Sequence, residues 1–299
     1  MSRIHDALKR AEQERSMRDR TGMDVEVPIA TPGTGPVPVI PASDAAPSRA
    51  AAPAASTSSP IAIDSALANC PVVTWQPVSK TMLFFSAEGQ ASGSEEFRTL
   101  RSRLYQLREK HALRKILVTS SLPQEGKSFV AANLAQVAAV QPGCRVLLID
   151  ADLRNPSLHL SLGTSPAPGL SEYLLGETEE FGIMQKGPLE NLFFIPAGRP
   201  VLGQAELVCN GRLKNLLDRV EPLFDWIILD SPASMPVSDS GLIANVCDGV
   251  LMVVRAEATP FDLVRKALRK LPEERMVGVV LNGIPPETDQ GIHRYYRVS

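Results

Sequence analysis

The sequence predicts an α/β fold in which helices flank both faces of a mostly parallel β-sheet. Six short aliphatic runs carry this prediction, because their apolar residues are continuous rather than alternating, as in strands covered on both sides. The runs lie at 116–120, 145–149, 191–195, 226–229, 249–254 and 277–281, separated by helical or loop segments. An amphipathic helix is predicted ahead of them at 95–108. Its apolar face carries Phe97, Leu100, Leu104 and Leu107.

A glycine-containing loop follows the first aliphatic run and reads Ser121-Leu122-Pro123-Gln124-Glu125-Gly126-Lys127-Ser128. A helical run from Lys127 to Val140 comes next and stops at Gln141-Pro142-Gly143. In such a strand–loop–helix unit the backbone amides and the helix N-terminus bind phosphates. The lysine reaches the β/γ oxygens and the serine hydroxyl holds Mg²⁺. The sequence therefore predicts a P-loop NTPase fold that binds a nucleoside triphosphate with magnesium.

Aspartates end two further aliphatic runs. Asp150 and Asp152 follow the run at 145–149, and Asp230 follows the run at 226–229. Functional residues of a parallel sheet gather at the carboxyl ends of its strands. A buried strand that delivers an aspartate beside a phosphate loop positions Mg²⁺ or its water shell. Three such elements in this order indicate a working nucleotide site rather than aspartates that only cap a helix or turn.

Four segments are predicted along the chain. Residues 1–20 form a short amphipathic helix, which is either a docking helix for a partner or membrane surface or a solvated terminal helix. Residues 21–67 form a linker rich in proline and alanine. Residues 68–290 form the P-loop domain, and residues 291–299 form a tail that carries tyrosines.

Composition narrows the functional classes. The net charge of -2 argues against a nucleic-acid partner. The four cysteines are scattered without a CxxC pair, which indicates reduced thiols packed in the core of a cytosolic protein. The charged N-terminus has no apolar signal core, and no window approaches the roughly 18 apolar residues of a membrane span. A cytoplasmic protein is expected.

These motifs resemble those of the bacterial tyrosine kinases of exopolysaccharide and capsule assembly, which are P-loop proteins unrelated in fold to eukaryotic-type kinases. The resemblance runs from about Glu95 to the C-terminus. The Walker A motif is matched by Ser121–Ser128, which lacks the first glycine of the general pattern, as the family commonly does. The DxDxR motif is matched by Asp150, Asp152 and Arg154, and the Walker B motif by Asp230-Ser231-Pro232.

The family also carries an ExxRxxR oligomerisation motif ahead of its first strand, matched here by Glu95, Arg98 and Arg101. The resemblance implies a homo-oligomer, as a ring, with these residues at the interface. They are expected along the side of the helix opposite Phe97 and Leu104. The alternative for the same charges is a solvated face with one i,i+3 ion pair.

The tail holds Tyr295 and Tyr296 between Arg294 and Arg297. In the family, a C-terminal tyrosine cluster is the autophosphorylation substrate, presented to the active site of a neighbouring subunit. The resemblance therefore implies that these two tyrosines accept phosphate. The cluster is smaller than in many relatives, so a chance pair of tyrosines is the alternative.

Phosphoryl transfer depends on positioning and charge neutralisation. The catalytic residues implied are Lys127, Asp150 and Asp152, and the metal ligands are Ser128, Asp152 and Asp230. One of Asp150 and Asp152 completes the metal shell and the other orients or deprotonates the tyrosine hydroxyl. The sequence does not decide which one acts as the base.

The nucleotide site is expected to bind ATP with Mg²⁺. Its predicted residues are Pro123, Gln124, Glu125, Gly126, Lys127, Ser128, Phe129, Arg154 and Asn282. Arg154 is assigned either to the phosphates or to holding Asp152. Asn282 is assigned either to the adenine or to an Asn-Gly turn.

The resemblance implies a transmembrane chain-length or activator protein of polysaccharide export as a partner, with this chain recruited through it to the inner face of the membrane. A cognate tyrosine phosphatase is a further implied partner. Two rival functions remain: a ParA/MinD-like ATPase, and a non-catalytic ATP-binding switch. The first is disfavoured by Leu122, which stands where those ATPases carry a signature lysine. A eukaryotic-type kinase is excluded by the absence of HRD and DFG motifs.

Overall fold

The computed structural model describes residues 67, 70–79, 81–84 and 93–284. The predicted N-terminal helix at 1–20 and the tail at 291–299, with Tyr295 and Tyr296, lie outside the described residues. So does the linker at 21–67, apart from its last residue.

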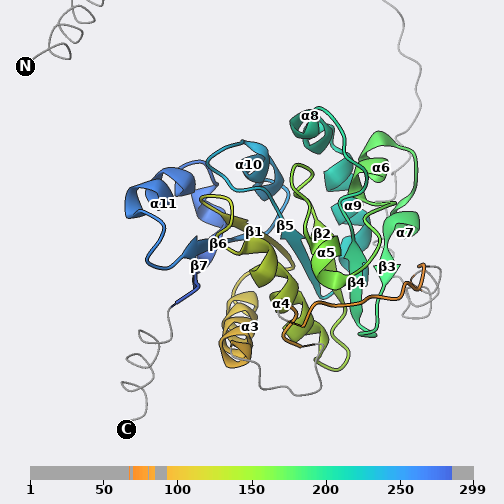
Figure 1. Cartoon of the computed structure of the whole chain (residues 1–299), viewed down its shortest axis with the longest axis horizontal. Helices are drawn as coiled ribbons and strands as arrows, with labels where there is room; N and C mark the ends of the chain where they lie inside the picture. The colour runs from red at the N-terminus through yellow and green to blue at the C-terminus, as the bar shows by residue number, and fades with distance from the viewer. Residues whose placement is uncertain (1–66, 68–69, 80, 85–92, 285–299) are drawn as a thin grey trace, which may run out of the picture. The chain divides into compact units, whose positions relative to one another are not determined.

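The described residues form a seven-stranded sheet in the order β3-β4-β2-β5-β1-β6-β7 (Figure 1). Its strands are β1 (Lys115–Ser120), β2 (Val146–Asp150), β3 (Gln185–Lys186), β4 (Leu192–Ile195), β5 (Trp226–Asp230), β6 (Gly249–Arg255) and β7 (Met276–Asn282). All neighbouring strands pair in parallel except β3, which is antiparallel to β4. The mostly parallel α/β sheet predicted from the sequence is confirmed, and each of the six aliphatic runs is a strand.

Helices cover both faces of the sheet, and the apolar side chains of each strand alternate between two separate cores. One core is formed with α3 (Ser94–Arg108), α4 (Lys127–Ala139) and α5 (Leu158–Leu162). The other is formed with α6 (Leu170–Leu175), α7 (Glu180–Ile183), α8 (Gln204–Cys209), α9 (Arg212–Val220), α10 (Asp239–Ala244) and α11 (Phe261–Leu268). Two short 3₁₀ turns lie at Glu221–Leu223 and Glu273–Arg275. This two-sided cover explains why the central strands read as continuous apolar runs.

The edge strand β7 departs from the expectation that every strand is covered on both faces. Val279 and Leu281 are 51% and 60% exposed, whereas the central strands are buried throughout. The cause is position, because β7 ends the sheet order and pairs only with β6 among the described strands. A continuous aliphatic run does not distinguish a central strand from such an edge strand.

A segment ahead of α3 packs against α4 through two buried amide side chains. The Leu83 amide donates to Asn133 Oδ1 at 2.8 Å, and Asn133 Nδ2 donates to the Thr81 carbonyl at 2.8 Å. Gln136 accepts a 3.3 Å hydrogen bond from the Phe84 amide. These contacts satisfy backbone groups that would otherwise be buried without partners. They fix the segment at 81–84 on the helix that begins at the phosphate loop.

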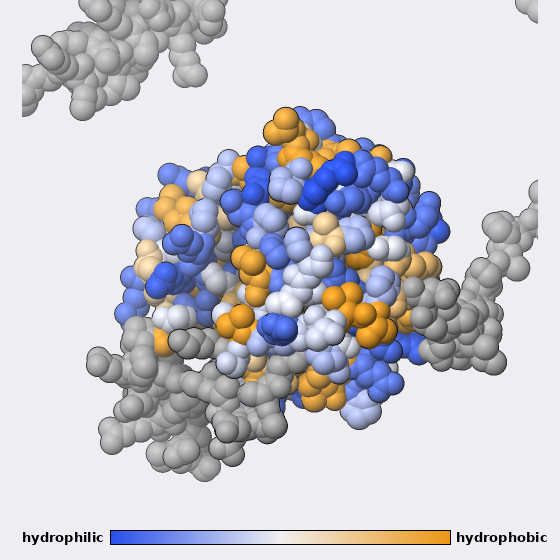
Figure 2. All heavy atoms as spheres, turned by 45° about the vertical axis from the view of Figure 1, so that its right-hand side comes forward, coloured by the Kyte–Doolittle hydropathy of each residue, from blue (hydrophilic) through white to orange (hydrophobic). Residues whose placement is uncertain are grey.

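The surface follows the ordinary pattern of a folded domain. In the view of Figure 2, hydrophobic residues occur as small groups between polar ones. Within the described residues, no helix combines the length and apolar character needed to cross a bilayer.

Candidate nucleotide site

The strand order brings the three predicted motifs to one edge of the sheet. β5 lies between β2 and β1, and the register pairs Asp150 with Asp230 and Val118 with Asp230. The phosphate loop leaves the carboxyl end of β1, and the two aspartate motifs leave those of β2 and β5. Parallel pairing therefore places all three at the edge where ligands bind in open α/β sheets.

The phosphate loop ends at Gly126, whose backbone demands glycine. Its φ of 92° lies in the left-handed region, and a Cβ there would lie 2.0 Å from Asn282 Nδ2. Gln124 also has a positive φ, of 66°. Gly126 caps α4 without a side-chain hydrogen bond, and the first turn of α4 carries no acidic residue. The first amides of this helix are thus left to bind an anion.

Glu125 anchors the loop from behind. One of its carboxylate oxygens accepts the Leu122 amide at 2.7 Å, and the other accepts the Thr259 hydroxyl. Its carbonyl accepts Asn282 Nδ2 at 2.9 Å. The side chain is buried and does not line the cavity in front of the loop. Of the predicted nucleotide-binding residues, Glu125 therefore shapes the loop rather than offering its side chain to a ligand.

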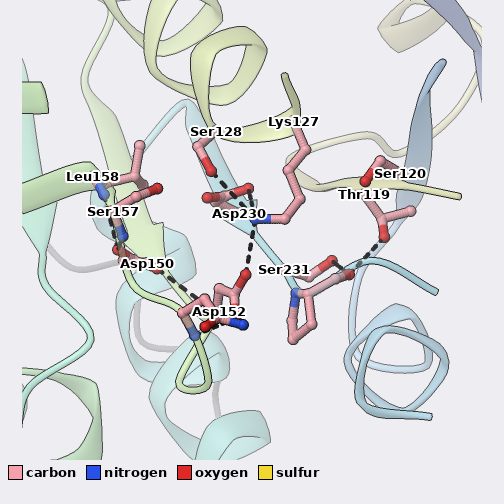
Figure 3. Close-up of polar contacts among 12 residues, drawn as sticks. Thr119, Ser120, Lys127, Ser128, Asp150, Asp152, Ser157, Leu158, Asp230 and Ser231 are labelled. Carbon is pink, nitrogen blue, oxygen red and sulfur yellow. Dashed lines mark hydrogen bonds and ion pairs between the residues drawn. The ribbon is translucent and has the colours of Figure 1, made fainter. Parts of the chain in front are cut away.

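Lys127 lies between two carboxylates, as Figure 3 shows. Its Nζ is 2.8 Å from Asp152 Oδ2 and 3.7 Å from Asp230 Oδ1, and it donates to Ser128 Oγ at 3.2 Å. Burial alone would lower the pKa of Lys127, but the charges of Asp230 and Asp152 outweigh it and the pKa is raised. The lysine is held charged among the groups predicted to meet phosphate and metal.

Asp150 is wholly buried and faces the backbone of the loop that follows it. It accepts the amides of Asp152, Ser157 and Leu158 at 3.2, 3.2 and 3.1 Å (Figure 3). Burial, reinforced by the charge of Asp230, raises the pKa of Asp150 well above its usual range. Asp152, in contrast, lines the cavity. The two carboxylates of the motif thus have different environments.

Asp230 is the least satisfied polar group of the site. Its side chain is fully buried, and neither carboxylate oxygen accepts a hydrogen bond from the described residues. Burial raises the pKa of Asp230 to about 6 despite the opposing attraction of Lys127. A buried carboxylate without donors is suited to a cation or its water shell. Together with the Ser128 hydroxyl and Asp152, it forms an all-oxygen donor set that fits Mg²⁺.

A cavity of about 540 Å³ lies in front of these groups. Six residues predicted for the nucleotide site, namely Pro123, Gln124, Gly126, Lys127, Ser128 and Phe129, line it, together with Asp152 and Arg154. Its remaining wall is made by Asn155, Ser157, Pro232, Ala233, Pro236 and Val237. Pro232 belongs to the Walker B match, and the other five were not predicted because they lie outside the motifs.

Arg154 does not hold Asp152, which was one of its two predicted assignments. Its Nε and Nη2 instead donate to Asp239 Oδ2 and Oδ1 at 2.7 and 3.1 Å. Asp239 begins α10, and sequence reasoning missed it because it belongs to no motif. The other assignment, to the phosphates, remains a proposal.

Asn282 ends β7 and contacts the phosphate loop through its amide nitrogen. It also lines a second cavity of about 470 Å³ with residues from α3, α4 and the end of β7. Phe129 lines both cavities, so the two spaces share a wall. Asn282 therefore stands next to the loop, where a nucleotide base could be contacted.

The predicted interface helix needs one correction. Glu95 and Arg98 form an ion pair on the exposed side of α3. Arg101 does not lie opposite Phe97, since residues four apart share a helix face. Its Nη1 donates to the Val137 carbonyl of α4 at 2.8 Å, so it lies beside the packed side of the helix.

Comparison with known proteins assigns the fold and motifs to a family. The tyrosine-protein kinase YwqD of Bacillus subtilis is 32% identical over 198 residues, which cover 66% of this chain and 83% of YwqD. The succinoglycan biosynthesis transport protein ExoP of Rhizobium meliloti is 35% identical over 194 residues. These cover 63% of this chain but 25% of ExoP, so the chain spans about a quarter of that relative.

Among solved structures, the kinase domain of the Escherichia coli tyrosine kinase ETK superposes with a TM-score of 0.63 at 29% identity. The match covers 70% of this chain and 83% of that domain. No family model matches the sequence. The similarity to YwqD over most of its length decides against the ParA/MinD-like rival. The chain belongs to the family of bacterial tyrosine-protein kinases.

Proposed function

We propose that this chain is an ATP-dependent protein-tyrosine autokinase that transfers the γ-phosphate of ATP to Tyr295 and Tyr296 of a neighbouring copy. One observation carries the proposal. Lys127 stands at the start of α4 between Asp152 and Asp230, at the wall of a cavity lined by the phosphate loop. This arrangement can neutralise a triphosphate and orient its terminal group, which is most of what phosphoryl transfer requires.

The loop amides and the free N-terminus of α4 would bind the phosphates, and Lys127 would turn from its carboxylates to the β/γ oxygens. Ser128, Asp152 and Asp230 would hold Mg²⁺. When bound, Mg²⁺ would supply positive charge that offsets the negative charge of the phosphates. The full burial of Asp230 without donors supports this role, because the carboxylate otherwise carries a charge with one partner at 3.7 Å.

Asp150 is proposed to hold the loop that carries Asp152, because it is buried, accepts three backbone amides and does not line the cavity. Asp152 is proposed to orient or deprotonate the tyrosine hydroxyl, because it is the carboxylate of the motif that lines the cavity. Its pairing with Lys127 also suits a metal ligand. This division assigns different tasks to two carboxylates whose environments differ.

The base of the nucleotide is proposed to lie by Asn282. Because Asn282 Nδ2 already donates to the Glu125 carbonyl at 2.9 Å, its Oδ1 is left to accept a hydrogen bond. The 6-amino group of adenine donates such a bond, whereas guanine presents an acceptor there. The neighbouring Phe129 and Ile284 offer apolar surface for the ring.

Assembly and recruitment complete the proposal. Glu95 and Arg98 on the exposed side of α3 would contribute to a ring of copies, in which one tail reaches the next active site. Phosphate would add roughly -1.5 to -2 charge per tyrosine and weaken the hold of the acidic site on the tail. ExoP is named as a transport protein of succinoglycan biosynthesis. By analogy, a transmembrane partner of polysaccharide export would recruit this chain to the membrane. A tyrosine phosphatase would remove the phosphate from the tail.

The deciding experiment incubates the purified chain with Mg·ATP, with and without a host membrane fraction, and maps phosphotyrosine by mass spectrometry. Lys127→Met serves as the control. Phosphate on Tyr295 or Tyr296 that disappears in the control supports the autokinase. ATP binding or hydrolysis with an unmodified tail in both conditions would replace it with the ATP-binding switch.

A further inference from the structure

The two aspartate loops of the site are tied together by an ion pair. Arg154 follows β2 and Asp239 begins α10 after the loop that leaves β5. The guanidinium contacts both carboxylate oxygens, at 2.7 and 3.1 Å. The Asp239 side chain is 3% exposed and that of Arg154 is 34% exposed. The carboxylate is therefore buried behind a guanidinium that reaches the cavity.

The pair leaves Arg154 able to bind a ligand. A guanidinium has five N–H donors, and two of them are used on Asp239. Within the part of the chain that the structure describes, no hydrogen bond engages Nη1. Two-point contact fixes the plane of the guanidinium and so fixes the direction of its remaining donors. A lone arginine on a loop would have to be ordered by its ligand, at a cost in affinity.

The location of Arg154 selects the phosphate that it would meet. The cavity is lined by Gln124 and Gly126 of the phosphate loop and by Arg154, Asn155 and Ser157 of the loop that follows β2. Asp152, two residues before Arg154, contacts the Nζ of Lys127 at 2.8 Å. Since the lysine of a phosphate loop serves the β/γ oxygens, the Arg154 loop lies on the side of the terminal phosphate.

We propose that Asp239 is a positioning residue that holds Arg154 toward the terminal phosphate, so that the pair favours a nucleoside triphosphate over a diphosphate. This inference rests on the proposed nucleotide site and adds to it a residue that touches no substrate. Asp239 acts through Arg154, which distinguishes it from a group that only stabilises the fold.

The test measures the affinity of the full chain for Mg·AMP-PNP and for Mg·ADP. The ratio is the affinity for Mg·AMP-PNP divided by the affinity for Mg·ADP. A general loss of structure weakens both nucleotides, whereas a lost contact to the terminal phosphate lowers the ratio. Arg154→Ala is expected to lower the ratio about tenfold, as for a hydrogen bond to a charged group. Asp239→Asn is expected to lower it about threefold or more, since the guanidinium loses its charged anchor. The double variant should fall no further than Arg154→Ala alone.

Glu180→Gln is the matched control. Glu180 is also a buried carboxylate paired with an arginine, at 2.6 Å to Arg219, but neither residue lines the nucleotide cavity. Its ratio should equal that of the parent. Arg154→Lys supplies a second route if Asp239→Asn does not fold. Lysine keeps the charge but cannot make the two-point contact, so the ratio should fall with this variant as well.

An unchanged ratio in folded Asp239→Asn, or independent effects that multiply in the double variant, would overturn the inference. The readout does not depend on phosphoryl transfer. A parent that binds both nucleotides but phosphorylates nothing would overturn the kinase proposal while the ratio still decides the role of Asp239. A parent that binds neither nucleotide would overturn both.

Discussion

Asp230 is predicted to weaken the ligand-free protein at neutral and alkaline pH. The pKa of this carboxyl group is near 3.8 in an unfolded chain and about 6 in the folded one, because burial disfavours its charge more than the attraction of Lys127 favours it. The folded state therefore binds the proton more tightly than the unfolded state. Stability falls as the pH rises through this window, and the full penalty is present above pH 6. A difference of about two pKa units corresponds to about 3 kcal/mol.

Replacing Asp230 with asparagine removes the charge and with it the penalty. In metal- and nucleotide-free buffer, Asp230→Asn should raise the free energy of unfolding by about 3 kcal/mol at pH 8 and by about 1 kcal/mol at pH 4.5. Urea unfolding followed by tryptophan fluorescence suits the measurement. Trp75 and Trp226, the two tryptophans of the chain, are both buried. With Mg·ATP the order should reverse, since the parent alone retains the metal-binding carboxylate.

Asp218→Asn provides the comparison. Asp218 lies in an exposed i,i+4 pair with Lys214, so its loss should change stability by less than about 1 kcal/mol. The explanation for Asp230 is wrong if Asp230→Asn is less stable than the parent at pH 8. It is equally wrong if the gain in stability is the same at pH 4.5 and pH 8, because the cause would then not be ionisation.

Two further substitutions test the packing around the loop. Gly126→Ala should fold but lose more than tenfold in ATP affinity. The added Cβ would lie 2.0 Å from Asn282 Nδ2 and displace that side chain, and an alanine at this positive φ costs about 1–2 kcal/mol of backbone strain. Gly143→Ala has φ of 70° and no atom within 4 Å, so an equal loss of affinity there would contradict the contact argument. Asn133→Leu should lower the free energy of unfolding, measured by urea unfolding, by about 2–4 kcal/mol. The reason is that the Leu83 amide and the Thr81 carbonyl lose their partners. An unchanged free energy of unfolding would show that this segment does not stabilise the fold.

Much of the fold could be predicted because most of its strands are parallel and covered on both faces. Continuous aliphatic runs are typical of such strands, although the edge strand β7 also carries one, and the aspartates and glycine that follow the runs meet at one edge of the sheet. The two-residue strand β3 was missed, because so short an element has no periodicity to detect. The strand order also lay beyond prediction, since it depends on how each crossover packs.

The site was predicted to the extent that its residues belong to motifs. Lys127, Asp152 and Asp230 come together as expected. The roles of Asp239 and Glu125 could not be predicted in this way. Both carboxylates bind partners distant in sequence, Arg154 and Thr259, and a motif does not reveal such contacts. The prediction for Arg101 was wrong because it was grouped with Glu95 and Arg98 of its motif. Its four-residue spacing from Phe97 places it near the same side of the helix as Phe97.

The anchoring of Glu125 has a kinetic consequence. Its side chain and carbonyl tie the phosphate loop to Thr259, in the loop between β6 and α11, and to Asn282, at the end of β7, before any nucleotide arrives. A loop that is already shaped has no closing step to complete, so nucleotide capture should follow single-exponential kinetics with a rate linear in concentration. The residence time, rather than the capture rate, would then separate tight from weak nucleotides.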